Sequence, residues 1–327
     1  MHLYNKSLAS LTAGAILLIG ATSCRLSPPP RASAEPFSKT SSYHGWSNAV
    51  FMSNGRVEAI VVPSIGRVMQ FHFSGEEEGP FWENRALDGK APNPTSSEWG
   101  NFGGDKSWPS PQSDWPKATG RAWPPPQAFD SMSVETAVQD NALLLTSKVD
   151  PHYGIRTSRR IELPAGTSSM RIITTYQKVA GPPQTLGVWI ITQLRNPVMV
   201  YIPLPAPSKP GKGYEEQSKD LPAGLKNDSG LLSLTRDTTK STKIGTHAEK
   251  LIWVGNSEVL TIEQQREAGR PYPDQGSSAE VYTNPDPLPY VELEMLGPLH
   301  EMKVGDAISQ TNLYTLSKRA AADFKPR

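Results

Sequence analysis

Apolar and polar residues alternate with a period of two through most of the chain after residue 45, and this alternation restricts the fold more than any other feature. Clear examples are RVEAIVVPS from Arg56, MRIITTYQKV from Met170 and EVLTIEQQ from Glu258. Runs rich in Val, Ile, Thr and aromatic residues, bounded by Gly, Pro, Asn or Asp, are typical of β-strands with one buried face. Helical stripes are missing from the pattern. We count roughly a dozen strands or more, which predicts packed antiparallel sheets.

The predicted fold is all-β: one large antiparallel β-sandwich from about residue 43 to 318, followed by a tail at 319–327. The composition agrees, because 31 prolines among 327 residues and 37% hydrophobic residues suit a loop-rich β protein. The pair Asp140-Asn141 is a predicted hairpin turn. No internal repeat is visible, so a propeller is not expected.

Two segments interrupt the alternation, and we expect both to be insertions between strands. Residues 203–229 are polar and rich in Pro, Gly and Lys, which indicates a surface excursion. Residues 80–130 are different, because GGDKSWPSPQSDWP from Gly103 fits neither a helix nor a strand period. Five of the eight tryptophans fall in this segment: Trp82, Trp99, Trp108, Trp115 and Trp123. These rings either close an irregular loop over a core or form a surface on which a ligand docks, and both readings stay open.

Residues 1–24 resemble a lipoprotein-type signal peptide. A basic start precedes the apolar run LASLTAGAILLIG, and small residues lead to Cys24, the only cysteine. The run is short for a membrane span. We therefore expect export, a lipid anchor on Cys24, a flexible tether at 25–42 and a cell-envelope location at the outer membrane, facing the periplasm. Ordinary cleavage after Ala34 is the alternative.

Charge and motifs exclude several function classes. Lys and Arg number 33 and Asp and Glu 32, a net charge of +1, which argues against a nucleic-acid binder that depends on a basic field. The motifs of nucleotide, zinc-protease and α/β-hydrolase sites are missing from the sequence. The histidines are scattered, and with Cys24 as an anchor the mature domain has no thiol. We therefore predict neither a metal nor a cofactor, and the pattern does not indicate an oligomeric state.

Several pieces in a fixed order carry a resemblance to a known family. They are EAIVVPSIGRVMQF from Glu58, FWEN from Phe81, WGNFGGDKSWPSPQSDWP from Trp99, AWPPP from Ala122, YVELEMLGPL from Tyr290, KVGD from Lys303 and TNLYTL from Thr311. Over residues 45–316 this order resembles the DUF4380 family, a domain of unknown function. More distantly it resembles the galactose mutarotase-like sandwiches, which implies a sandwich of that kind.

The mutarotase resemblance also implies a catalytic pattern. In mutarotases a glutamate on a late strand acts as base and a histidine donates a proton. Glu294 best resembles that glutamate, and Glu292 lies on the same strand face. The histidine is missing from GVWIITQL at 187–194, and only His72 and His152 offer replacements. A solvated strand face is the alternative reading of the two glutamates.

The tryptophan segment also has the composition of a sugar site. Sugars present apolar C–H faces and polar rims, so their sites combine flat rings with a few placed polar groups. Prolines stiffen the segment, and Gly103-Gly104 permits unusual backbone angles that would present the next two residues inward. The predicted binding residues are Asn101, Asp105, Lys106, Trp108, Gln112, Trp115, Trp123 and Glu292. We further predict one concave surface shared by Lys106, Trp108, Gln112, Trp115 and Glu294.

Three functions remain open at this point. The first is a cell-envelope protein that recognises a carbohydrate ligand. The second is a sugar-processing enzyme, an epimerase, lyase or hydrolase, with Glu294 as base. The third is a structural lipoprotein that docks on another envelope protein. Rings that line a cleft with Glu294 favour the first two functions, and rings buried under the loop favour the third.

Overall fold

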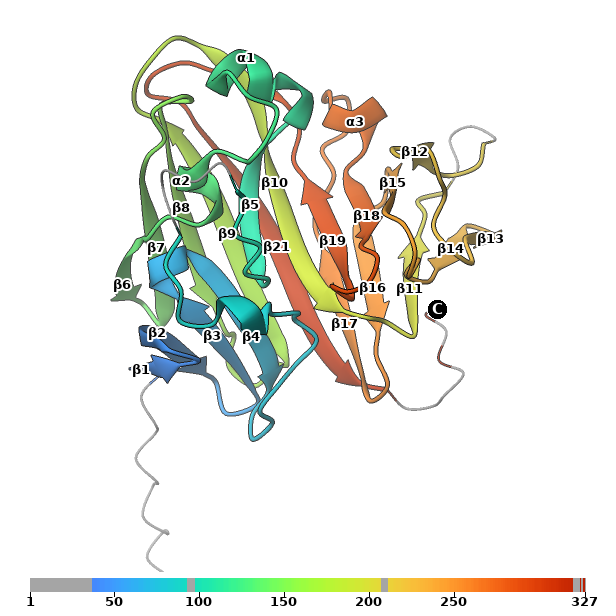
Figure 1. The fold of residues 1–327 in the computed structure, drawn as a ribbon, viewed down its shortest axis with the longest axis horizontal. Helices are drawn as coiled ribbons and strands as arrows, with labels where there is room; N and C mark the ends of the chain where they lie inside the picture. The colour runs from blue at the N-terminus through green and yellow to red at the C-terminus, as the bar shows by residue number, and fades with distance from the viewer. Residues whose placement is uncertain (1–36, 93–97, 207–210, 320–323, 325, 327) are drawn as a thin grey trace, which may run out of the picture. The chain divides into compact units, whose positions relative to one another are not determined.

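The alternating segments form two large antiparallel sheets that face each other (Figure 1). The computed structural model describes residues 37–92, 98–206, 211–319, 324 and 326. The first sheet contains, in spatial order, β1 (Ser38–Tyr43), β2 (Trp46–Ser53), β3 (Val57–Val62), β4 (Arg67–Phe73), β5 (Asp105–Ser110), β10 (Gln184–Arg195), β19 (Tyr290–Leu296), β18 (Ala279–Thr283), β15 (Thr242–Thr246) and β12 (Glu215–Glu216), with β20 (His300–Met302) paired to β10. The all-β sandwich prediction is confirmed.

The second sheet is built in the same antiparallel way. It contains β13 (Lys226–Asp228), β14 (Leu231–Leu234), β11 (Met199–Pro203), β16 (Lys250–Val254), β17 (Glu258–Glu263), β21 (Ala307–Lys318), β9 (Ser169–Lys178), β8 (Ile155–Glu162), β7 (Ala142–Val149) and β6 (Glu135–Gln139). The helices are short: η1 (Pro63–Ile65), η2 (Arg85–Leu87), η3 (Gln112–Asp114), α1 (Trp115–Thr119), α2 (Gln127–Asp130) and α3 (Pro273–Gly276). The turn Asp140-Asn141 joins β6 to β7 with φ angles of 47° and 55°, as the two-residue hairpin requires.

The two faces of the first sheet have different surroundings. Thr192 of β10 donates a hydrogen bond to Asp105, and Tyr314 of the second sheet donates to the same carboxylate. Even-numbered positions of β10 therefore face the second sheet and form the core with it. Because side chains alternate along a strand, odd-numbered positions of β10, such as Trp189 and Gln193, face the other way. We call that side of the first sheet the open face.

The tryptophan-rich segment contains a central strand, so the prediction that it is only an insertion is wrong. β5 pairs with β10 over its whole length, from Asp105 opposite Thr192 to Ser110 opposite Gly187. It pairs with β4 only where Val68 lies opposite Asp105. The rest of that edge of β5 is not paired with β4, so Pro109, which has no N–H to donate, is tolerated there. The proline and the flanking glycines hid this strand in the sequence.

Gly103 and Gly104 allow backbones to approach closely where β5 begins. Both have positive φ angles, of 91° and 71°. A Cβ on Gly103 would lie 2.2 Å from the carbonyl oxygen of Trp82, and one on Gly104 would lie 2.5 Å from that of Val68. Any larger residue would therefore push β5 away from its neighbours.

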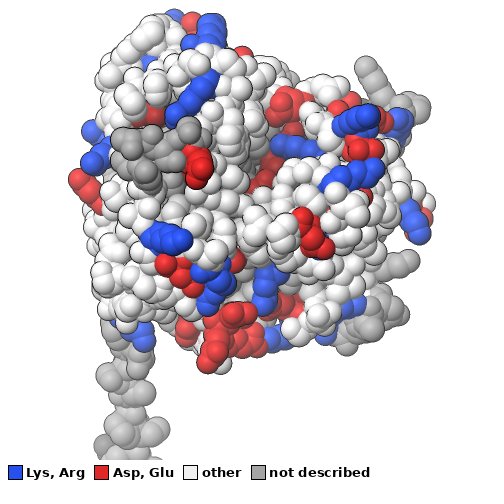
Figure 2. Space-filling model, viewed as in Figure 1, with Lys and Arg blue, Asp and Glu red and all other residues white. Residues whose placement is uncertain are grey.

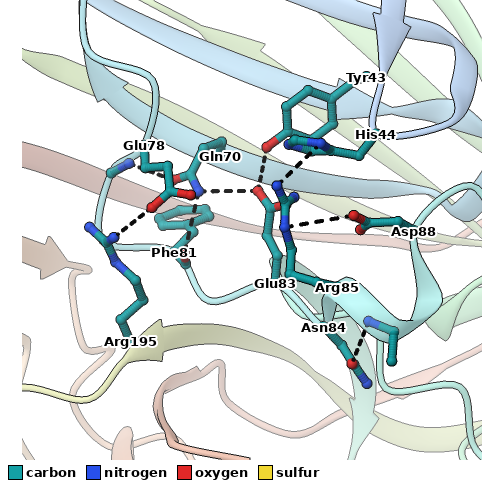
Figure 3. Close-up of polar contacts among 12 residues, drawn as sticks. Tyr43, His44, Gln70, Glu78, Phe81, Glu83, Asn84, Arg85, Asp88 and Arg195 are labelled. Atoms are coloured by element: carbon teal, nitrogen blue, oxygen red, sulfur yellow. Dashed lines mark hydrogen bonds and ion pairs between the residues drawn. The ribbon is translucent and has the colours of Figure 1, made fainter.

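The predicted tether is too long, because its last residues are a strand. Ser38–Tyr43 pairs with β2, and a polar network holds the end of this hairpin (Figure 3). The Tyr43 hydroxyl donates to Glu83 at 2.5 Å, and Glu83 also accepts hydrogen bonds from Gln70 at 3.1 Å and from Arg85 at 2.8 Å. The serines and threonines of this strand are typical of a linker, but they also suit an exposed edge strand.

Three other predictions concern the insertion at 203–229, the end of the domain and the N-terminal signal. The segment 203–229 carries the short strands β12 and β13 and is not free of regular structure. The last strand, β21, ends at Lys318. The signal at 1–24, Cys24 and the alternative cleavage after Ala34 lie outside the described residues, and export with a lipid anchor stays a prediction. Within the described part of the chain, no helix has the length and apolar character needed to cross a bilayer.

Candidate functional site

A row of ionisable side chains crosses the open face of the first sheet. Lys106 of β5 lies opposite Ile191 of β10, Ile191 lies opposite Glu294 of β19, and Glu294 lies opposite Glu280 of β18. Directly opposed residues of antiparallel strands project from the same face, so these four positions form one line. Figure 2 shows this face hollowed between the segments that carry α1 and α3, with acidic and basic side chains in the hollow.

One end of the row is a tight ionic cluster around Lys243 of β15. Its ammonium lies 2.6 Å from Glu280 and 2.9 Å from Glu294, and Trp189 donates its indole N–H to Glu294 at 2.7 Å. Burial raises the pKa of Glu280 to about 8, although Lys243 opposes the shift. The two carboxylates raise the pKa of Lys243 despite its burial. The ammonium of Lys243 is therefore occupied by ion pairs with Glu280 and Glu294.

The other end of the row is a looser pair, Lys106 and Glu292. The Lys106 side chain is fully buried, and its ammonium lies 3.6 Å from Glu292, just beyond ordinary hydrogen-bond distance. Among the described residues, this ammonium has no hydrogen-bond partner. It lies 4.9 Å from the ring centre of Trp108 and 5.6 Å from that of Trp99. Lys106 is therefore a buried cation with unused donors beside two aromatic rings.

Burial also moves the pKa values of both members of this pair toward 7. It lowers the pKa of Lys106 to about 8, with Glu292 opposing the shift. It raises the pKa of Glu292 to about 7, with Lys106 opposing and Glu294 reinforcing the change. A buried carboxyl and a buried amine with such values, side by side, are features common at functional sites.

Amide groups of two buried side chains, Gln193 and Asn101, also lack hydrogen-bond partners in whole or in part. Gln193 is fully buried opposite Glu292, and neither its amide nitrogen nor its amide oxygen has a hydrogen-bond partner of good geometry in the described chain. The amide oxygen of Asn101 is likewise without one. Buried polar groups are nearly always paired, so this concentration of unpaired groups indicates a place for water or a ligand.

The tryptophans divide into packed and accessible rings. Trp115 is fully buried, and Trp108 is 4% exposed and packs edge-on against Trp189 at 5.4 Å. Trp99 is half-buried beside Lys106, and Trp123 is 43% exposed and stacks on Trp115. Trp115 is therefore mainly a packing residue, whereas Trp99 and Trp123 have ring surface left for a ligand.

Asp130 of α2 holds two of these rings in place. It accepts the indole N–H of Trp108 at 2.9 Å and that of Trp99 at 3.1 Å. Its charge is balanced by the buried guanidinium of Arg67 at 2.8 Å. These contacts connect the loop to β4 and fix the ring of Trp99 near Lys106.

Asp105 is a correction to the predicted site. Its carboxylate points between the sheets, where it pairs with Arg159 of β8 and accepts hydrogen bonds at 2.6 Å from both Thr192 and Tyr314. The sequence argument expected Asp105 and Lys106 on one surface. In an extended strand, neighbouring residues point to opposite faces, so Asp105 belongs to the core.

The other predicted residues are placed as follows. Trp108 and Trp115 contact Trp189, which contacts Glu294, and Lys106 lies over the ring of Trp108. Gln112 is exposed in η3, next to the group in the chain, and its place on the shared surface stays a prediction. The proposed replacement histidines do not contact Glu294. His72 is buried in β4, and His152 lines a separate groove of about 470 Å³ with Ser110 and Glu301.

Sequence reasoning missed Lys243, Glu280 and Gln193. Lys243 and Glu280 lie in the short strands TKIGT and AEVYT, each with one charged side chain among apolar and hydroxyl neighbours. From the sequence alone, a single charged residue in a strand is expected to face solvent. Only the pairing of β15, β18 and β19 shows that these charges converge.

The charged row is not arranged as a metal site. Among the described residues, no group of three or more His, Cys, Asp or Glu side chains could hold a metal ion. Glu280 and Glu294 approach each other, but the ammonium of Lys243 lies where a cation would bind. The arrangement suits hydrogen bonding and proton exchange with an organic ligand.

A family model described as "Domain of unknown function (DUF4380)" matches residues 48–316. No curated protein matches the chain. Among solved structures, a galactose mutarotase-like protein from Lactobacillus casei ATCC 334 aligns with a TM-score of 0.55 at 8% identity, over 83% of this chain and 100% of that one. A candidate aldose 1-epimerase from Escherichia coli K12 aligns with a TM-score of 0.54 at 11% identity, over 83% and 99%.

A TPR-domain containing protein from Parabacteroides distasonis ATCC 8503 aligns with a TM-score of 0.53 at 14% identity. The alignment covers 85% of this chain but only 50% of that protein. At such identities the likeness shows the fold alone, a galactose mutarotase-like β-sandwich.

Proposed function

Because the chain belongs to the DUF4380 family, a domain of unknown function, its role has to be inferred from its own residues, and we propose that it recognises a carbohydrate on the open face of the first sheet. The observation that carries this proposal is the buried ammonium of Lys106, which has no hydrogen-bond partner in the described chain and lies beside Trp99 and Glu292. A buried cation that makes no hydrogen bonds is costly even beside a carboxylate, and a ligand that accepts its hydrogen bonds reduces that cost.

The chemistry of this corner matches a sugar. Lys106 supplies donors, and Glu292 supplies an acceptor 3.6 Å away, so the two can bind neighbouring hydroxyl groups of one ring. Gln193 adds an amide group without a hydrogen-bond partner in the described chain, and Asn101 adds an amide oxygen without one. The ring of Trp99 offers a flat apolar surface for the C–H face of the sugar. The mutarotase-like fold supports a carbohydrate role, since two of its structural neighbours are named for sugar chemistry.

A titration followed by intrinsic tryptophan fluorescence tests the proposal. We expect a panel of neutral monosaccharides and their methyl glycosides to include at least one saturable ligand. Lys106→Met should weaken its binding at least about tenfold, because the hydrogen bonds to a charged donor are lost. Lys250→Met is the matched control, since Lys250 lies on β16 of the second sheet, where it pairs with Glu263. The absence of saturable binding across the panel would contradict the proposal.

An enzymatic role on sugars is the second candidate, and one observation favours it. Glu292 and Lys106 have pKa values moved to about 7 and about 8, which suits groups that exchange protons near neutral pH. Glu294, the predicted base, already accepts hydrogen bonds from Trp189 and Lys243, so Glu292 is the better proton acceptor. Analysis of the sugar recovered after the titration, for a changed anomer or epimer, separates turnover from binding.

The buried positions of Trp108 and Trp115 fit the third alternative, a structural protein, as far as those two rings are concerned. A purely structural loop does not account for the unused hydrogen-bond donors of Lys106 or the amide of Gln193. We therefore propose packing for the inner rings and ligand contact for Trp99.

A further inference from the structure

We propose that the preferred ligand is an amino sugar whose ammonium group pairs with Glu292 on the side that faces β18. This inference rests on the proposed sugar recognition at the same site and adds the chemical class of the ligand. It comes from the balance of charges on the open face, from the partners that those charges already have, and from the aromatic side chains around Glu292.

Carboxyl groups outnumber cations in the cleft. Glu280, Glu292 and Glu294 lie on the open face, and the described cations that pair with them are Lys106 and Lys243. The nearby guanidinium of Arg67 is paired with Asp130. Asp274 of α3 adds a fourth carboxyl close enough for Lys243 and Glu294 to influence its pKa. Asp274 is half-buried, and its carboxylate has no hydrogen bond or ion pair with the described residues. The site therefore has more carboxyl groups than its own lysines can balance when all of them are ionised.

The carboxyl pKa values agree with this imbalance. Burial raises the pKa of Glu280, Glu292 and Asp274, and Glu294 raises each of them further. An additional positive charge in the cleft favours the ionised form of all three groups. A ligand that supplies that charge is consequently bound more tightly than a neutral ligand of the same shape.

The surroundings of Glu292 define where the ammonium group fits. Gln193 lies opposite Glu292 on the β10 side, and Lys106 approaches from the strand beyond. On the other side, Tyr282 of β18 lies opposite Glu292, and its ring centre is 6.3 Å from that of Tyr290. A carboxylate next to aromatic rings is a favourable environment for an organic ammonium. Hydroxyl groups then remain for Lys106.

The same charges disfavour anionic sugars. A uronate or a sugar phosphate that used Lys106 as its anchor would place its negative charge beside Glu292, which lies 3.6 Å from that lysine. Lys243 offers no alternative, because it is engaged by Glu280 and Glu294. Repulsion from these carboxylates is therefore not compensated within the cleft.

Calorimetric titration of the purified protein at pH 7 with three matched probes tests the inference. The probes are D-glucosamine, D-glucose and D-glucuronate, which differ in charge but share most of the ring. We expect glucosamine to bind about tenfold more tightly than glucose, as one charge-assisted hydrogen bond provides, and glucuronate to bind most weakly. Equal binding of glucosamine and glucose, or tightest binding of glucuronate, overturns the inference but leaves sugar recognition standing. Absence of binding by all three overturns the inference, and sugar recognition falls with it only if the panel of neutral monosaccharides also contains no ligand.

Two variants tie the preference to the proposed residues. Glu292→Gln keeps the shape of the side chain and should reduce the ratio of glucosamine to glucose affinity to about one. Asp274→Asn, at a half-buried position, should reduce the ratio by a smaller factor and covers the case in which Glu292→Gln fails to fold. Glu263→Gln on β17 is the matched control, and it should leave the ratio unchanged. An undiminished ratio in both cleft variants contradicts the assignment.

Discussion

Replacing Asp105 with alanine is expected to lower the free energy of unfolding by about 3–5 kcal/mol, the usual cost of breaking a buried ion pair from one side. Asp105 is fully buried between the sheets, where it pairs with Arg159 and accepts hydrogen bonds from Thr192 and Tyr314. Without it, the guanidinium of Arg159 keeps its burial and loses its only ion-pair partner among the described residues. Chemical denaturation of the wild type and the variant measures the difference.

The matched control is Asp220→Ala. Asp220 also forms an ion pair, with Lys240, but both side chains are largely exposed. Exposed pairs are worth about 0–1 kcal/mol, so this variant should lie close to the wild type. A loss of less than about 1 kcal/mol for Asp105→Ala would show that Asp105 is not the core residue described above.

Truncating Trp115 to alanine should cost about 3–5 kcal/mol of stability, because a fully buried indole is removed and a cavity remains. Trp115 packs against Trp108 and Trp189, and its N–H bonds to the carbonyl oxygen of Pro109. Trp123→Ala should cost about 1 kcal/mol or less, because that ring is 43% exposed. Thermal and chemical denaturation of both variants provide the comparison.

Sugar binding by the same two variants then shows whether each ring contacts the ligand or only packs in the core. Trp123→Ala should fold normally and weaken binding only if its exposed ring touches the ligand. If Trp115→Ala retained its stability and lost only ligand binding, Trp115 would be a wall of the site and not part of the packed core.

The alternation of residues was enough to predict a sandwich, because a period of two carries over directly to strands with one buried face. It failed at β5, where Pro109 and the adjacent glycines disguise a strand that lies at the centre of the sheet. It also failed at Ser38–Tyr43, where an exposed edge strand has the composition of a linker.

The site was predictable only in part. Lys106 and Glu292 came from the polar tryptophan segment and from the resemblance of a late strand, and the structure brings them within 3.6 Å. Asp105 was misplaced because the segment was taken for a loop, in which neighbouring side chains can point the same way. Lys243 and Glu280 depend on strand register, a property of the whole sheet that the local sequence does not contain.

The location of a bound sugar tests the central claim most directly. A crystal structure with the tightest ligand of the panel should show its ring beside Trp99, with hydroxyl oxygens in hydrogen-bond contact with Lys106 and Glu292. Density for the ligand in the groove lined by Ser110, His152 and Glu301, with the open face of the first sheet empty, would contradict the account.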